Sequence, residues 1–140
     1  MQSLDDAYSN ADYIPNADRF VSHWENAAQI FRDKLHEEAR ADCDITYGPT
    51  ERQKFDFFST ISHSDDVFIF IHGGYWLRFD KSNWSHLATG ALQRGWHVAI
   101  PSYELCPEVR ISEISLQIAK AVKEITKRTT GKIALAGHSA

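Results

Sequence analysis

The residues best suited to chemistry in this chain follow two apolar runs. Segment 67–76 reads VFIFIHGGYW, and segment 132–140 reads KIALAGHSA. A serine on a sharp turn after a strand can act as a nucleophile, and it needs small neighbours there. Glycines after another strand leave peptide N–H groups uncovered, as an oxyanion hole requires. The pattern predicts a nucleophile at Ser139 and oxyanion donors at the N–H groups of Gly73, Gly74 and Ala140.

Three motifs in this order resemble one known family. They are HGGYW at 72–76, YELCP at 103–107 and GHSA at 137–140. Together they resemble the α/β-hydrolase superfamily, and within it the arylformamidase (kynurenine formamidase) and related esterase branch. The resemblance implies hydrolysis of N-formylkynurenine or a related N-formyl arylamine to the amine and formate, with Ser139 attacking the formyl carbon. It implies no metal and no organic cofactor.

The resemblance also assigns supporting roles around the two glycines. His72 shapes the oxyanion loop in this family rather than acting as the base, and Tyr103 belongs to a stretch that supports the same loop. An Asp often precedes that tyrosine, whereas Ser102 stands there in this chain. Tyr75 and Trp76 either pack over the strand end or form one wall of the substrate pocket, and the sequence leaves both readings open.

The catalytic acid and base cannot be assigned in this chain. In α/β-hydrolases the order is Ser, then Asp or Glu, then His, and here only Ala140 follows Ser139. We therefore expect residues 1–140 to be the N-terminal part of a longer enzyme, or a truncated product of one. A serine without a base is a poor nucleophile, so we expect the 140-residue chain alone to be inactive.

Hydrophobic periodicity and turn signals predict a mixed α/β fold. Helices are expected at 16–41, 82–94 and 112–128, and strands at 44–47, 54–59, 67–71, 97–100 and 132–136. The first two strands read as an antiparallel hairpin, and the later alternation of strand and helix predicts a mostly parallel sheet. This matches an α/β-hydrolase fold truncated at the nucleophile elbow, with residues 1–41 as an N-terminal segment and helix, and 42–140 as the start of the sheet core.

Composition and charge argue against several other classes of protein. The 140 residues are 43% hydrophobic and 24% charged, with a net charge of -4, which argues against a nucleic-acid-binding face. No apolar run is long enough for a membrane span, and two cysteines make no disulfide framework. We expect a cytoplasmic protein with a small-molecule substrate, and a homodimer stays open. The alternatives are a short-acyl carboxylesterase and a non-catalytic protein that keeps the fold.

Overall fold

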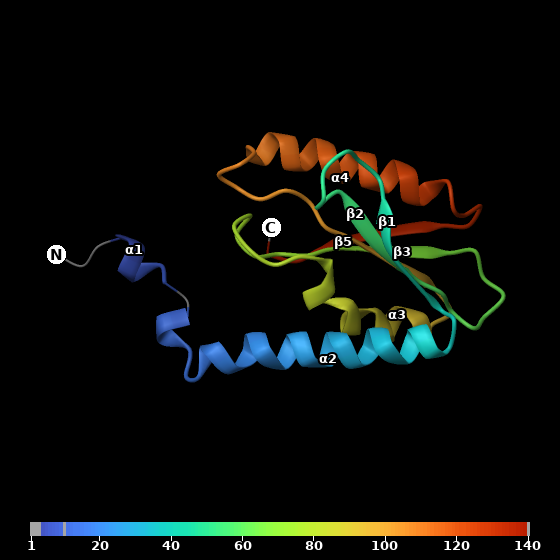
Figure 1. Ribbon diagram of the computed structural model, residues 1–140, viewed down its shortest axis with the longest axis horizontal. Coiled ribbons are helices and arrows are strands. Elements are labelled where there is room, and N and C mark those ends of the chain that lie inside the picture. Colours follow the sequence, from blue (N-terminus) through green and yellow to red (C-terminus); the bar gives the residue numbers. More distant parts are fainter. Residues whose placement is uncertain (1–3, 10, 140) are drawn as a thin grey trace.

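The computed structural model describes residues 4–9 and 11–139, and it has the mixed α/β architecture that the sequence predicts (Figure 1). Its elements, in chain order, are α1 (Leu4–Ala7), the 3₁₀ turn η1 (Ala11–Tyr13), α2 (Ala17–Glu37), β1 (Ala41–Thr46), β2 (Lys54–Phe58), β3 (Val67–Ile71), the 3₁₀ turns η2 (Lys81–Asn83) and η3 (Ser85–Ala88), α3 (Thr89–Gln93), β4 (His97–Pro101), α4 (Ile111–Thr126) and β5 (Ile133–Gly137).

The strands form one sheet in the order β1-β2-β4-β3-β5. β1 and β2 make the expected antiparallel hairpin, β2 is also antiparallel to β4, and β3 is parallel to both β4 and β5. Ile71 at the end of β3 pairs with Gly137 at the end of β5. Because parallel strands finish at the same edge of a sheet, the residues that follow β3 and β5 lie together.

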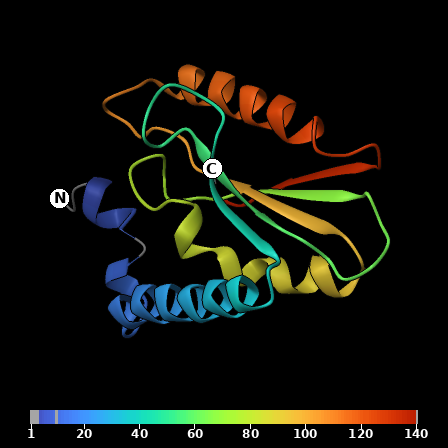
Figure 2. The same ribbon diagram turned by 45° about the vertical axis from the view of Figure 1, so that its right-hand side comes forward.

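Apolar side chains cover both faces of the sheet. Helix α4 lies over one face, and α2 and α3 lie over the other (Figures 1 and 2). The cluster on the α4 side contains Tyr47, Phe55, Phe57, Val67, Ile69, Ala99, Ala121 and Ile125. The cluster on the α2 side contains Leu35, Phe58, Ala88, Leu92, Val98 and Ile100. Successive residues of β4 therefore enter opposite clusters, as a strand covered on both faces requires.

The helix predicted at 16–41 is shorter in the structure. Helix α2 ends at Glu37 rather than near Ala41. Ala39 has a left-handed φ of 53°, and the N–H of Arg40 donates to the carbonyl of Leu35. This turn ends the helix, so that Ala41 begins β1.

The expected helix at 82–94 is also replaced, by two 3₁₀ turns and the short α3. Asp80 accepts a hydrogen bond from the N–H of Ser82 at 2.7 Å, and its own N–H donates to Asn83 at 3.0 Å. This reciprocal cap starts a short turn. Trp84 then leaves helical geometry with φ −120° and ψ 4°, which separates η2 from the turns that follow.

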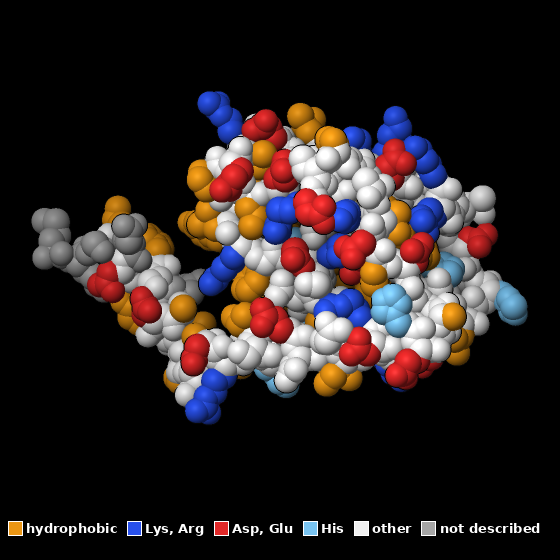
Figure 3. Space-filling model, in the orientation of Figure 1, with side chains coloured by type: hydrophobic (Ala, Val, Ile, Leu, Met, Phe, Trp, Pro, Cys, Tyr) orange, Lys and Arg blue, Asp and Glu red, His pale blue; other side chains and the backbone are white. Residues whose placement is uncertain are grey.

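The surface shows no large field of one charge sign on the face in view. Acidic and basic side chains are interspersed in Figure 3, and hydrophobic side chains gather where the N-terminal segment meets the body. Within the described ranges, no helix is both long enough and apolar enough to cross a membrane.

Candidate active site

His72, the first residue after β3, is fully buried. Its ring stacks on that of Tyr103 with centroids 4.4 Å apart, and the Tyr103 hydroxyl donates to the His72 carbonyl at 2.6 Å. Nδ1 of His72 lies 2.8 Å from the carbonyl oxygen of Gly73. Because a carbonyl oxygen only accepts, Nδ1 must carry the proton. Burial lowers the pKa of His72 to about 4, so the ring is neutral and its proton is already engaged.

The same hydrogen bond sets the direction of the next peptide. The Gly73 carbonyl faces the buried His72 ring, and in a trans peptide the following N–H points to the opposite side. The Gly74 N–H therefore points away from His72. Neither Gly73 nor Gly74 has an acceptor for its N–H among the described residues, and both line the same cavity as Ser139. The loop thus offers two unused donors beside the serine.

Close contacts explain why glycines occupy these two positions. A Cβ on Gly73 would lie 2.3 Å from the carbonyl oxygen of His138 and 2.7 Å from that of Ser139. Gly74 has φ +132°, and a Cβ there would lie 2.2 Å from the carbonyl oxygen of Arg78. A side chain at either position would push the loop out of place.

The residues after the glycines continue in an unusual conformation. Tyr75, Trp76 and Phe79 have φ values of 57°, 58° and 71°. Left-handed backbone at a non-glycine residue costs roughly 1 kcal/mol or more and persists only where the surroundings impose it. One restraint is the N–H of Cys106, which donates to the Trp76 carbonyl at 2.8 Å.

Ser139 also has a left-handed backbone, with φ 52°. The residue before it is tied to the sheet, because the N–H of His138 donates to the carbonyl of Ile71 at 3.1 Å. A strained turn directly after a strand is the geometry expected of a nucleophile elbow. Ala140, the expected third oxyanion donor, lies outside the described residues.

The serine and the two glycines open onto a cavity of about 420 Å³. The loop after β3 and the end of β5 form one side of this cavity. The other side comes from the N-terminal segment and the start of α2, with Ala11, Ile14, Ala17, Asp18, Phe20, Val21 and Trp24. The sequence showed α2 to be amphipathic, but nothing in it indicated that the helix lines a pocket.

Aromatic rings join the two sides. Trp24 of α2 stacks on Phe20 at 6.2 Å, lies 5.1 Å from Trp84 and meets the edge of Phe79 at 6.5 Å, all between ring centroids. Of the two predicted pocket residues, Tyr75 lines the cavity and Trp76 does not. The main aromatic wall is therefore Trp24, Phe79 and Trp84 rather than the Tyr75–Trp76 pair.

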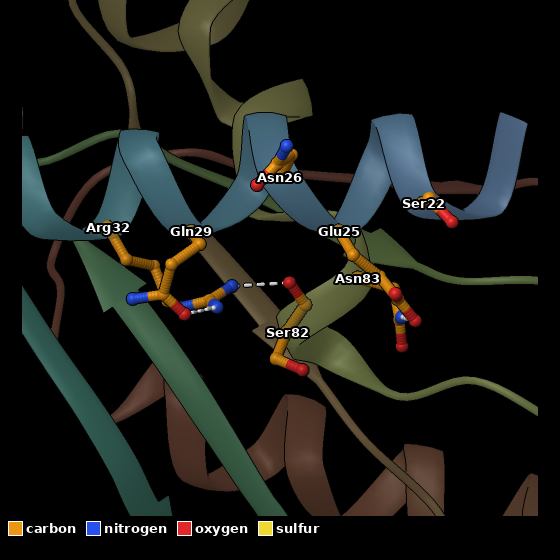
Figure 4. A pocket seen from close by; sticks show the side chains of 7 residues that line it. All are labelled: Ser22, Glu25, Asn26, Gln29, Arg32, Ser82 and Asn83. Atoms are coloured by element: carbon orange, nitrogen blue, oxygen red, sulfur yellow. Dashed lines mark hydrogen bonds between the residues drawn. The ribbon is translucent and has the colours of Figure 1, made fainter. Parts of the chain in front are cut away.

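A second hollow of about 490 Å³ lies between α2 and η2 (Figure 4). Its lining is polar, and hydrogen bonds already join its members. Arg32 donates to the Ser82 carbonyl, to the Ser85 hydroxyl at 2.9 Å and to Gln29 at 2.6 Å. Hydrogen bonds across this polar hollow hold α2 against η2, which follows the glycine loop (residues 72–80). None of the predicted nucleophile or oxyanion residues lines it.

Arg52, which no motif indicated, ties the glycine loop to the Tyr103 stretch. Its guanidinium donates to the carbonyl of Tyr103 at 2.7 Å and to the carbonyl of Phe79. Ser102, whose place in the network the sequence left in doubt, accepts from the N–H of Lys81 at 2.9 Å. Its own carbonyl accepts from the Tyr47 hydroxyl at 2.6 Å. Tyr103 therefore contacts His72 at one end of the loop and Arg52, which also binds the Phe79 carbonyl; its supporting role stays a prediction.

Other histidines and candidate ligands lie apart from the cavity. His97 is held by Ser64 and Thr60 and stacks on Phe57. Among the histidines of the described chain, only His138 lines the cavity. No cluster of three or more His, Cys, Asp or Glu residues suited to a metal ion is found in the part of the chain that the structure describes.

Two curated proteins are similar in sequence to part of this chain. Kynurenine formamidase of Drosophila melanogaster is 32% identical over 97 residues, 64% of this chain, and that of Salmo salar is 27% identical over 100 residues, 69% of the chain. The matched parts make up 32% and 34% of those proteins. The chain thus spans about a third of these curated relatives. No protein-family model matches the sequence.

Solved structures share the fold. A candidate thioesterase of Silicibacter sp. TM1040 is 51% identical, with a TM-score of 0.91 over 99% of this chain and 52% of its own. Esterase B of Lactobacillus rhamnosis, at 16% identity, has a TM-score of 0.65 over 85% of this chain and 46% of its own. The chain therefore has a partial α/β-hydrolase fold. Within that superfamily it is assigned to the arylformamidase- and esterase-like proteins, which confirms the resemblance seen in its motifs.

Proposed function

We propose that this chain carries the nucleophile and the oxyanion loop of a serine hydrolase of the arylformamidase type. The observation that supports this most is the pairing of a strained Ser139 with the unengaged N–H groups of Gly73 and Gly74 at one cavity. Donors that no protein acceptor uses, placed beside a nucleophile, are available to a developing negative charge.

The proposed reaction is a two-step acyl transfer. Ser139 Oγ attacks the formyl carbon of an N-formyl arylamine, and the N–H groups of Gly73, Gly74 and Ala140 hold the resulting oxyanion. Collapse of this intermediate breaks the C–N bond, the protonated base gives its proton to the leaving amine, and a formyl-serine ester remains. Water activated by the same base then hydrolyses this ester to formate and free serine.

The general base is not found among the described histidines. His72 is buried and its Nδ1 proton is bonded to Gly73. His138 lines the cavity, but we expect its side chain to point away from Ser139, as the middle position of an elbow directs. We therefore propose that the base and its acid partner belong to other residues of the active enzyme, and that residues 1–140 alone are inactive.

Cavity chemistry favours an N-formyl arylamine such as N-formylkynurenine over a short-acyl ester. The aromatic wall suits an arylamine ring. Asp18 and Arg78 line opposite sides of the cavity, and no ion pair joins them to each other or to other described residues. The Arg78 guanidinium lies over the Phe79 ring, 5.0 Å from its centroid. This guanidinium and the Asp18 carboxylate would complement the carboxylate and ammonium of N-formylkynurenine, which a simple ester lacks.

The test compares kcat and KM of the full-length protein on N-formylkynurenine and on 4-nitrophenyl acetate. We expect turnover of the formamide, with Ser139→Ala abolishing both turnover and fluorophosphonate labelling. Asp18→Asn should raise KM for the formamide about tenfold and leave the ester unchanged. Asp33→Asn, on the outer face of the same helix, is the matched control. Turnover of the ester alone would contradict the formamidase proposal, and labelling that persists in Ser139→Ala would contradict the serine mechanism.

A further inference from the structure

A buried carboxylate interrupts the apolar strand β2. Asp56 is 1% exposed, in the sequence KFDFF. Its Oδ1 accepts from Lys81 Nζ at 2.9 Å and from the N–H of Asp44 at 3.0 Å. Burying a carboxylate costs several kcal/mol, which is recovered only when the charge is well paired. The stability of β2 therefore depends on the element that supplies a cation to pair with the Asp56 carboxylate.

That partner is the first residue after the glycine loop. Lys81 opens η2, and its ammonium also lies 2.8 Å from Asp44 Oδ1. Burial alone would lower the pKa of Lys81, but the carboxylates of Asp56 and Asp44 outweigh it and raise that pKa above its ordinary value. Lys81 is thus a cation held from two sides, while its backbone N–H donates to Ser102.

Lys81 fixes one end of a strained loop, and His72 fixes the other. Between them lie Gly74 and three residues with left-handed φ angles, among them Phe79. Such a backbone returns to lower-energy conformations when its ends are released. The direction of the Gly73 and Gly74 N–H groups therefore depends on both ends, and not on the His72 end alone.

We propose that Asp56 and Lys81 are positioning residues that hold the downstream end of the oxyanion loop, so that the Gly73 and Gly74 N–H groups stay aimed at the oxyanion. This inference rests on the proposed function for its catalytic consequence. An ion pair that served stability alone would be replaceable by apolar side chains without loss, because such replacements are often neutral or stabilising.

The test uses the full-length double variant Asp56→Leu/Lys81→Met. We expect it to fold with a Tm near that of the parent, while kcat and the rate of fluorophosphonate labelling fall about 10- to 100-fold, because misplacement by about 1 Å can cost that much. KM should change less than about threefold, since the oxyanion forms only after attack. Lys54→Met, which breaks the exposed Lys54–Glu51 pair of the same hairpin, is the matched control.

Amide NMR shifts of Gly73 and Gly74 give a readout that does not need activity. They should move in the double variant and stay in place in Lys54→Met. If the double variant does not fold, Asp56→Asn replaces it, because it keeps the shape of the side chain and removes the charge that pairs with Lys81. Unmoved shifts, or a kcat within twofold of the parent in a folded variant, would overturn the positioning role. A parent with neither turnover nor labelling would instead overturn the proposed function.

Discussion

The two strand ends that meet at the cavity are supported in very different ways. After β3, His72 is completely buried, stacked on Tyr103 and bonded to Gly73. At the end of β5, Gly137 and the following His138 and Ser139 are exposed, and the turn is tied to the sheet by the hydrogen bond from the His138 N–H to the Ile71 carbonyl. β5 is also an edge strand, with Leu135 58% exposed.

This difference indicates that the described residues hold the loop after β3 more firmly than the serine turn after β5. The loop after β3, which we propose to supply the oxyanion donors, carries several left-handed residues, and it is held by buried contacts at both ends. The serine turn carries one such residue and takes its place from the pairing of β5 with β3. We therefore expect changes at the β3 end to alter both stability and rate, and changes beside the serine to alter little except at Ser139 itself.

The largest effect among these tests should come from Gly74→Pro. Proline removes one N–H and fixes φ near −65°, whereas Gly74 has φ +132°. Loss of one oxyanion donor costs about 3–4 kcal/mol, or roughly 10²–10³ in kcat, and distortion of the loop adds to this. KM should change far less than kcat, because the oxyanion forms only after attack. The measurement is steady-state kinetics of the full-length enzyme.

Tyr75→Phe provides the control for that experiment. It keeps the backbone of the loop and removes only an exposed hydroxyl, so we expect kcat within about threefold of the parent. A folded Gly74→Pro enzyme with near-normal kcat would show that the loop supplies no essential donor.

Removing the buried histidine should change how stability depends on pH. The pKa of His72 is about 4 in the folded protein, against 6.5 for an ordinary histidine. Below pH 6.5 the unfolded chain binds this proton more readily, so stability falls as the pH drops and levels off below the folded pKa. From pH 7 to pH 5 the loss due to His72 is about 2 kcal/mol.

His72→Asn should lack this contribution, because asparagine does not titrate. Urea unfolding of the full-length protein and the variant, at both pH values, measures the difference. Equal pH dependence in the two proteins would mean that His72 is not buried in neutral form.

The smallest effect should come from the exposed strand end. His138→Ala removes a side chain that we expect to face away from the serine, so the labelling rate should change less than about threefold and stability by less than about 0.5 kcal/mol. A loss of more than tenfold in labelling would instead identify His138 as a base.

The sequence alone predicts the elements whose signal is local. Strand Val67–Ile71 matches its predicted bounds. A short, continuous apolar run is typical of a strand inside a sheet that is covered on both faces. The two glycines were indicated by the backbone freedom of their residue type, and the serine turn by its position after a strand and by its small neighbours. The helix expected at 82–94 was wrong, because the backbone leaves helical geometry at Trp84 and the segment forms two 3₁₀ turns and the short α3 instead.

Long-range contacts could not be predicted in the same way. An aspartate within KFDFF signals that a buried charge needs a partner, but it does not tell which of many lysines pairs with it. Likewise, the periodicity of α2 shows an apolar face without showing what that face covers. Only the folded chain brings Lys81 to Asp56 and Trp24 to the cavity beside Ser139.

A crystal structure of the full-length protein after reaction with an aryl phosphonate tests the central claim most directly. We predict phosphorus bonded to Ser139 Oγ, with the phosphonyl oxygen 2.7–3.1 Å from the N atoms of Gly73 and Gly74, the range expected for oxyanion donors. The aryl group should lie against Trp24. Phosphorus on another residue, or a phosphonyl oxygen directed to solvent away from both glycines, would contradict the assignment of this loop and this serine.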